Sequence, residues 1–149
     1  MGAGDGIRAA RADQVEEVLA VHGPILGLSA QRARELVVHA TARGSLLVHV
    51  AASGQIDGYV LVEPQGLFGR DLVKLLVVAS SARRRGIGAA LLSAAVHASS
   101  TSRVFTSTNA SNAAMRALLD KGGWQLSGTL SGVDPGDDEV VYYRDARAG

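Results

Sequence analysis

The fold is decided by residues 76–92, which read LVVASSARRRGIGAALL. The stretch overlaps an apolar, β-branched run at residues 72–78, a pattern typical of a strand buried on both faces. Residues 87–100 instead repeat apolar side chains with the period of a helix. Between them, Gly86 and Gly88 allow a tight turn and leave backbone N–H groups uncovered, and the helix that begins there directs its positive end at them. The sequence therefore predicts an anion-binding turn between a strand and a helix.

The turn also resembles a known signature, which reads Gln or Arg, two residues, Gly, one residue, and then Gly or Ala. Arg83, Gly86 and Gly88 occupy those positions, so the stretch resembles the acyl-CoA-binding segment of the GNAT acyltransferase superfamily. In that family, amides of the loop hold the pyrophosphate of coenzyme A, and a splayed strand binds the pantetheine arm. The resemblance implies acetyl-CoA as acyl donor, with no metal, held by Leu76, Val77, Val78, Arg83, Arg84, Arg85, Gly86, Ile87, Gly88, Ala89, Asn109 and Asn112.

The resemblance extends along nearly the whole chain. A helix is expected at residues 12–19, capped by Asp13, and another at residues 30–43, capped by Ser29 and stopped by Gly44. The other matching segments are a first strand at 7–10, a hairpin at 45–62, a fifth strand at 103–107, and a late helix with its Gly-aromatic ending at 112–124. We predict an α/β (α+β) domain over residues 1–149, with a mixed, mostly antiparallel central sheet of about six to seven strands flanked by about four helices. Residues 63–70 and 128–138 are expected to be irregular.

Composition favours one compact domain and excludes several classes of protein. The chain has 149 residues and no cysteine, which excludes a disulfide framework and a cysteine acyl-enzyme. Its apolar runs are too short to span a membrane and its start has no signal-peptide pattern, so a cytoplasmic address is expected. A net charge of +1 argues against a nucleic-acid-binding surface. The four histidines lack metal-ligand spacing, and the Gly-Lys-Ser/Thr ending of a kinase-type phosphate loop is missing.

The proton donor for the departing thiolate is not where the family usually has it. Leu119 stands at the position of a tyrosine found in many members. A thiol with a pKa near ~8.5 is a fair leaving group at neutral pH, so transfer stays feasible. The candidate replacements are a water molecule or the hydroxyls of Tyr142, Tyr143, Ser107, Thr108 and Ser111.

A base for the attacking amine is also not assigned by pattern. Where some members have a glutamate on the fourth strand, this chain has Leu72, and the nearby carboxylates are Glu63 and Asp71. Strand alternation directs Asp71 to the other face from Leu72. An α-amine, with a pKa of about 7.7 to 8, is neutral more often at pH 7 than a lysine amine at ~10.4, so a weakly equipped site favours the less basic amine.

We therefore predict an N-acyltransferase that moves an acetyl group from acetyl-CoA directly to a primary amine of a small molecule or peptide. Carboxylates at Glu63, Asp71 and residues 134–139 favour a cationic or polar acceptor. The alternative is a catalytically weak or inactive acyl-CoA-binding module with a regulatory role. The resemblance allows a homodimer, and predicts no membrane or nucleic-acid partner.

Overall fold

The structure is a computed structural model that describes residues 6–21 and 27–146. Its strands form one sheet in the order β1-β2-β3-β4-β5-β7-β6, antiparallel throughout except between β4 and β5. The strands are β1 (Ile7–Ala9), β2 (Leu46–Val50), β3 (Ile56–Leu67), β4 (Arg70–Val78), β5 (Arg103–Asn109), β6 (Gln125–Asp134) and β7 (Asp137–Asp145). The α-helices are α1 (Val15–Leu19), α2 (Ala30–Arg43), α3 (Ile87–His97) and α4 (Ala113–Lys121). The predicted fold class is confirmed.

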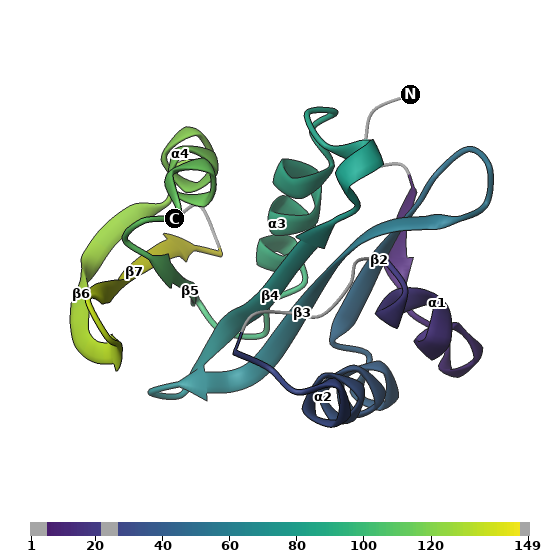
Figure 1. The fold of residues 1–149 in the computed structure, drawn as a ribbon, viewed down its shortest axis with the longest axis horizontal. Coiled ribbons are helices and arrows are strands. Elements are labelled where there is room, and N and C mark those ends of the chain that lie inside the picture. The colour runs from purple at the N-terminus through teal and green to yellow at the C-terminus, as the bar shows by residue number, and fades with distance from the viewer. Residues whose placement is uncertain (1–5, 22–26, 147–149) are drawn as a thin grey trace.

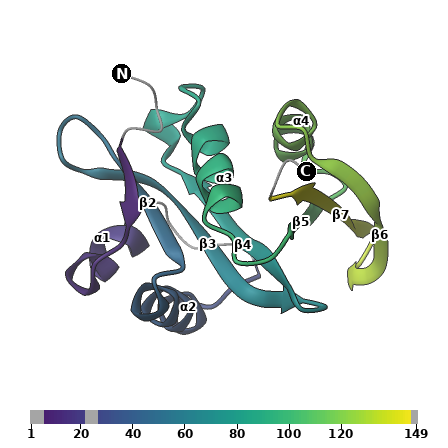
Figure 2. The same ribbon diagram turned by 180° about the vertical axis from the view of Figure 1, so that it is seen from behind.

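Helices cover the sheet unevenly (Figure 1). The strands β1 to β4 carry α1 and α2 on one face and α3 on the other, whereas the β5-β7-β6 part carries α4 on the side of α3. Figure 2 shows that none of the described helices covers the opposite face of this second part. None of the helices described is long and apolar enough to cross a bilayer.

Each face of the sheet has its own hydrophobic core. Val37, Leu46 and Tyr59 pack in the core under α1 and α2, while Leu91 and Tyr142 pack in the core under α3 and α4. Neighbouring side chains of a strand point to opposite faces, so the core that a side chain joins tells which face it occupies.

Helix ends follow the predicted signals in two cases and differ in one. Ser29 Oγ accepts a hydrogen bond from the Arg32 amide at 3.1 Å, and Gly44 ends α2 with φ of 74°. Asp13 is not the cap of the first helix, because residues 12–14 form a short 3-10 helix that precedes α1. Gln14 Oε1 instead accepts from the Arg11 amide at 2.9 Å.

Both segments expected to be irregular are in fact hairpins. Strand β3 continues to Leu67 and β4 begins at Arg70, with Phe68 at φ of 48° and Gly69 at φ of 77° making the turn. Strands β6 and β7 meet at a turn that contains Gly136 at φ of 74°. Solvent-exposed strands lack the apolar alternation that marks a half-buried strand, so these polar segments resembled loops.

The β4–β5 contact is short and positions the site. It pairs Asp71 with Val104, Leu72 with Phe105, and Val73 with Thr106, and no register pair follows. We call these three pairs the seam. Beyond the seam, β4 and β5 diverge, β4 on the side of α3 and β5 on the side of α4 (Figure 1). We call the separation between these two backbones the gap.

Candidate active site

The edge of β4 beyond the seam presents backbone groups that do not bond to β3. The Ala79 amide donates to the Asp57 carbonyl of β3 at 2.8 Å, so the backbone of Ala79 points toward β3. Peptide groups alternate in direction along a strand, so those of Val78 and Leu76 point away from β3 and into the gap. The gap therefore offers the donors and acceptors that a strand-like ligand needs.

The turn before α3 offers a second set of donors. Arg84 and Gly86 have φ of 66° and 79°, and Gly86 occupies the helix N-cap without a side chain to bond the first turn. The first helical hydrogen bond joins the Ala90 amide to the Gly86 carbonyl at 3.0 Å. The amides of residues 87–89 thus have no partner within the helix, and the helix dipole favours an anion there.

Side chains around the turn leave this position open. Arg83, Arg84 and Arg85 are all exposed, and Arg83 Nε donates to the Val78 carbonyl at 3.5 Å. The side chain of Ile87 is buried in the α3 core, so only its backbone is available to a ligand. Val77 likewise packs toward α1 and α2, and the exposed Ala89 follows on the first turn of α3.

Gly88 lies where α3, α4 and β4 meet. A Cβ at this position would lie 3.4 Å from Leu118 Cδ2, 3.8 Å from Val78 Cγ2 and 3.9 Å from Leu76 Cδ2. These are ordinary contact distances for one methyl, but a larger side chain would fill the space between α4 and β4. Gly58 on β3 also lies where the backbone is closely packed, because a Cβ there would lie 3.1 Å from the Val77 carbonyl oxygen.

The two asparagines assigned to coenzyme A lie across the gap, at the end of β5, and both have structural partners. Asn109 Nδ2 donates to Asp134 Oδ2 at 2.7 Å, and Asn112 Oδ1 caps α4 by accepting from the Met115 amide at 3.1 Å.

The two candidate tyrosines lie on opposite faces of β7. Tyr142 is 2% exposed in the core under α4, where its hydroxyl accepts from Arg116 Nε at 3.1 Å. Tyr143 lies on the other face, and its hydroxyl donates to Gln125 Oε1 at 2.6 Å. Leu119 is fully buried, so no hydroxyl replaces it on α4 at that position.

The remaining hydroxyls named as donors are divided between the two faces as well. Thr108 is buried on the α4 face of β5, and Ser107 lies on the opposite face next to Glu139. Ser111 is engaged elsewhere, because its hydroxyl donates to Asp137 Oδ2 at 2.5 Å and its amide to Asp137 Oδ1 at 3.1 Å.

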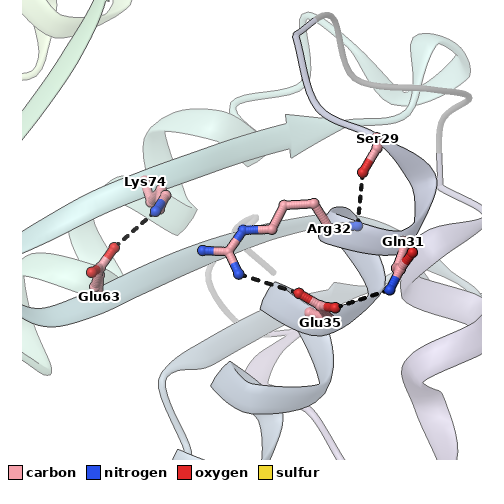
Figure 3. Close-up of polar contacts among 6 residues, drawn as sticks. All are labelled: Ser29, Gln31, Arg32, Glu35, Glu63 and Lys74. Atoms are coloured by element: carbon pink, nitrogen blue, oxygen red, sulfur yellow. Dashed lines mark hydrogen bonds and ion pairs between the residues drawn. The ribbon is translucent and has the colours of Figure 1, made fainter.

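Glu63 lines a cavity of about 400 Å³ between α2 and the sheet, on the face opposite α3. Figure 3 shows ion pairs on its two walls: Arg32 with Glu35 at 3.3 Å on α2, and Lys74 with Glu63 at 3.1 Å on the strands. The other lining residues are Leu36, His39, Arg43 and Leu61. The cavity therefore has charges of both signs, more cationic than the sequence suggested.

Asp71 does not join Glu63. It is 4% exposed on the α3 side of the sheet, where Oδ2 accepts from Ser99 Oγ at 2.9 Å and from the Ser100 amide at 3.2 Å. Its Oδ1 accepts from the Gln65 amide at 3.0 Å. These bonds hold the chain after α3, which ends at His97 rather than near residue 100. The geometry gives Asp71 a structural role, and Asp71 is not among the residues that line the α2 cavity.

Sequence reasoning missed one carboxylate beside the gap. The sequence did not distinguish Glu139 from the other carboxylates of residues 134–139, yet burial raises its pKa, and its Oε1 is buried without a hydrogen-bond partner in the part of the chain described. Alternation of side chains along β7 could have indicated that Glu139 points to the opposite face from Asp138.

Among the described residues, no cluster of three metal-ligating side chains occurs. His49 pairs with Asp57, and His22 lies outside the described residues.

The comparisons with known proteins agree with this geometry. The family described as acetyltransferase (GNAT) domain matches residues 18–128. No curated protein matches in sequence. A GNAT-family acetyltransferase structure from Bacillus cereus is 26% identical over 93% of this chain and 95% of that one, with a TM-score of 0.85.

Two further solved structures share the fold at lower identity. Ribosomal-protein-alanine N-acetyltransferase from Brucella melitensis is 24% identical with a TM-score of 0.76, covering 93% of this chain and 98% of that one. Ard1 from Thermoplasma volcanium is 20% identical with a TM-score of 0.76, covering 93% of this chain and 95% of that one. The family match spans most of the chain and the fold agrees with it, so this chain belongs to the GNAT acetyltransferase family.

Proposed function

We propose that this protein transfers an acetyl group from acetyl-CoA to a primary amine of a small molecule or peptide. The observation that carries the proposal is the gap beyond the seam, where β4 backbone groups that do not bond to β3 adjoin the amides of the first turn of α3. The first set suits the amide groups of pantetheine, and the second suits a pyrophosphate. The family uses acetyl-CoA as its co-substrate, and the residues present fit it.

In this proposal the chain positions the reactants and stabilises charge. Acetyl-CoA supplies a thioester whose carbonyl carbon bonds to the amine nitrogen as the C–S bond breaks and the sulfur leaves with the bonding electron pair. Backbone N–H groups of β4 near Val78 stabilise the developing negative charge on the carbonyl oxygen. Arg83 or Arg85 pairs with phosphate oxygens, because a guanidinium forms two parallel hydrogen bonds to them.

The acceptor enters from the α2 side, through the cavity that Glu63 and Lys74 line. Glu63 attracts an ammonium group, while Arg32 and Arg43 suit an anionic group on the same molecule. Tyr142 is the stronger candidate for protonating the thiolate, because it lies on the α4 face, whereas Tyr143 is occupied with Gln125 on the other face. Neither nucleic acid nor membrane is needed as a partner.

One experiment tests the proposal. Ligand-free protein is incubated with acetyl-CoA and a panel of amines that spans peptides, polyamines and amino-sugar antibiotics, and thiol release is followed with mass detection of the acetylated product. We expect at least one amine to gain roughly 42 Da, because an acetyl group (C₂H₃O) replaces one hydrogen on the nitrogen. Binding of acetyl-CoA without any product would favour the alternative, a catalytically inactive acyl-CoA-binding module, for which the buried Leu119 is the motivating observation.

A further inference from the structure

Glu139 lies beside the gap, on the face from which the acceptor would arrive. In the β5–β7 ladder it is opposite Asn109, and Ser107, the first β5 residue beyond the seam, is opposite Val141. Val140 and Tyr142 pack in the core under α3 and α4, so Glu139 and Val141 occupy the other face of β7. This is the face that carries Glu63 and Lys74 on the far side of the gap.

The carboxylate of Glu139 is only partly satisfied. Its Oε1 is buried and accepts no hydrogen bond from any described residue, and none of the described lysines, arginines or histidines pairs with it. Glu63, by contrast, is paired with Lys74 at 3.1 Å. A carboxylate that is desolvated and unpaired is the better proton acceptor, because ionic pairing stabilises the charged form and weakens the base.

The surroundings of Glu139 act on its pKa in two directions. Burial is the largest cause and raises the pKa above its ordinary value, and the charges of Asp134 and Asp137 raise it further. The Ser107 hydroxyl, a hydrogen-bond partner from β5, lowers it. The other polar group from β5 is the Asn109 amide, which is bonded to Asp134.

We propose that Glu139 is the general base of the transfer and accepts the proton of the attacking amine, directly or through one water molecule. As the C–N bond forms and the C–S bond breaks, the proton moves from nitrogen to the Glu139 carboxylate, and the sulfur leaves with the bonding pair. Glu139 then releases the proton to solvent. Ser107 is a positioning residue that holds the carboxylate toward the gap. This assignment rests on the proposed acetyl transfer.

The test compares Glu139→Gln with Glu17→Gln, the same change at an exposed position of α1 that belongs to no part of the site. With an amine found in the screen, kcat/KM of Glu139→Gln should fall by about 100-fold or more at pH 7, while acetyl-CoA binding and the Glu17→Gln rate stay unchanged. The acidic limb of the wild-type pH profile should disappear in Glu139→Gln. In Ser107→Ala it should move to higher pH, because the interaction that lowers the pKa of Glu139 is lost. A profile of Glu139→Gln that matches wild type would overturn the assignment.

A second measurement needs no acceptor. In protein with ¹³C-labelled glutamate side chains, the Glu139 carboxyl signal is identified by its loss in Glu139→Gln, and acetyl-CoA is then added. We expect the Glu139 signal to shift while that of Glu35, at the far wall of the α2 cavity, does not. Binding of acetyl-CoA, seen as thermal stabilisation, with an unmoved Glu139 signal overturns this assignment alone. Absence of acetyl-CoA binding overturns the proposed function and this assignment together.

Discussion

Thr106 Oγ1 donates a hydrogen bond to the Val73 carbonyl at 3.0 Å, and these two residues are also the last register pair of the seam. Thr106 is 1% exposed, so no water replaces its hydroxyl. The side chain thus satisfies the carbonyl at the position where β5 leaves β4, and defines the start of the gap.

Replacement of this hydroxyl should cost stability. Thr106→Val keeps the shape but leaves a buried carbonyl without this donor, so the free energy of unfolding in urea should fall by about 1–3 kcal/mol. Thr106→Ser is the control, since it retains the hydroxyl and loses one methyl, ~0.8 kcal/mol. If Thr106→Ser lowers the free energy of unfolding as much as Thr106→Val does, the hydrogen bond does not stabilise the seam.

Acetyl-CoA should stabilise the wild-type protein through the gap at Gly88. At about 100 times its dissociation constant, the ligand adds ~2.7 kcal/mol to the free energy of unfolding, which scanning fluorimetry detects as a higher Tm. Gly88→Leu should abolish this shift, because the side chain fills the space between Leu118, Val78 and Leu76. Gly88→Ala should keep it, since a single methyl finds only ordinary contacts there. A full ligand-induced shift in Gly88→Leu would place the cofactor elsewhere.

The two β7 tyrosines should differ in their effect on catalysis. Tyr142→Phe removes the hydroxyl on the α4 face, and kcat should fall by about 100-fold if that hydroxyl protonates the thiolate. Tyr143→Phe removes only the bond to Gln125 and should leave kcat within about twofold, since an exposed hydrogen bond contributes little. Steady-state kinetics at saturating acetyl-CoA make the comparison. Equal, small losses would instead assign the proton to water or Thr108.

Glu63 and Lys74 form an ion pair in the α2 cavity, so replacing either one with glutamine removes a charge of opposite sign. For a cationic acceptor, Glu63→Gln should raise the acceptor KM by about twofold to fivefold, and Lys74→Gln should lower it, while the KM for acetyl-CoA stays constant. Both effects should shrink at high salt, because these side chains are partly exposed. If the KM for acetyl-CoA changes in place of that for the acceptor, the cavity does not bind the acceptor.

The Asp137–Ser111 contact should make stability depend on acidity. Hydrogen bonds from Ser111 hold the pKa of Asp137 below its ordinary value, so this contribution is present at neutral pH and is lost as pH falls through the lowered pKa. The Tm difference between wild type and Ser111→Ala should therefore be full at pH 7 and shrink below about pH 4. Ser131→Ala, at an exposed β6 position, should show no such dependence. A Tm difference that persists at pH 2 would contradict the contribution of the carboxylate.

Local signals in the sequence predicted the elements whose causes are local. Ser29 and Gly44 bound α2, and the turn at residues 83–88 joins a strand to a helix, because each depends on the residues next to it. The hairpin strands between residues 63 and 70 were missed, since their polar side chains remain in solvent and lack a periodic apolar pattern.

The parts of the site that sequence reasoning could not supply depend on distant residues. Asp71 is buried by Ser99 and Ser100, which lie 28 and 29 residues away, and no pattern within β4 indicates that contact. Glu139 differs from Asp138 only by strand alternation and by its position opposite Asn109. Burial of one carboxylate in an acidic run requires the sheet order, which places β7 between β5 and β6.

The seam joins the two parts of the sheet by only three register pairs, beside the core that they share under α3 and α4. Strands β1 to β4 come from one stretch of sequence, and β5, β7 and β6 from another, so we expect local opening of the β5-β7-β6 part at a lower free energy than opening of β1 to β4. Amide protons of β5 and β7 should then exchange with solvent at a lower free energy than those of β2 and β3. A ligand bonded to both sides of the gap would remove that difference, and protection from hydrogen exchange would become uniform across the sheet.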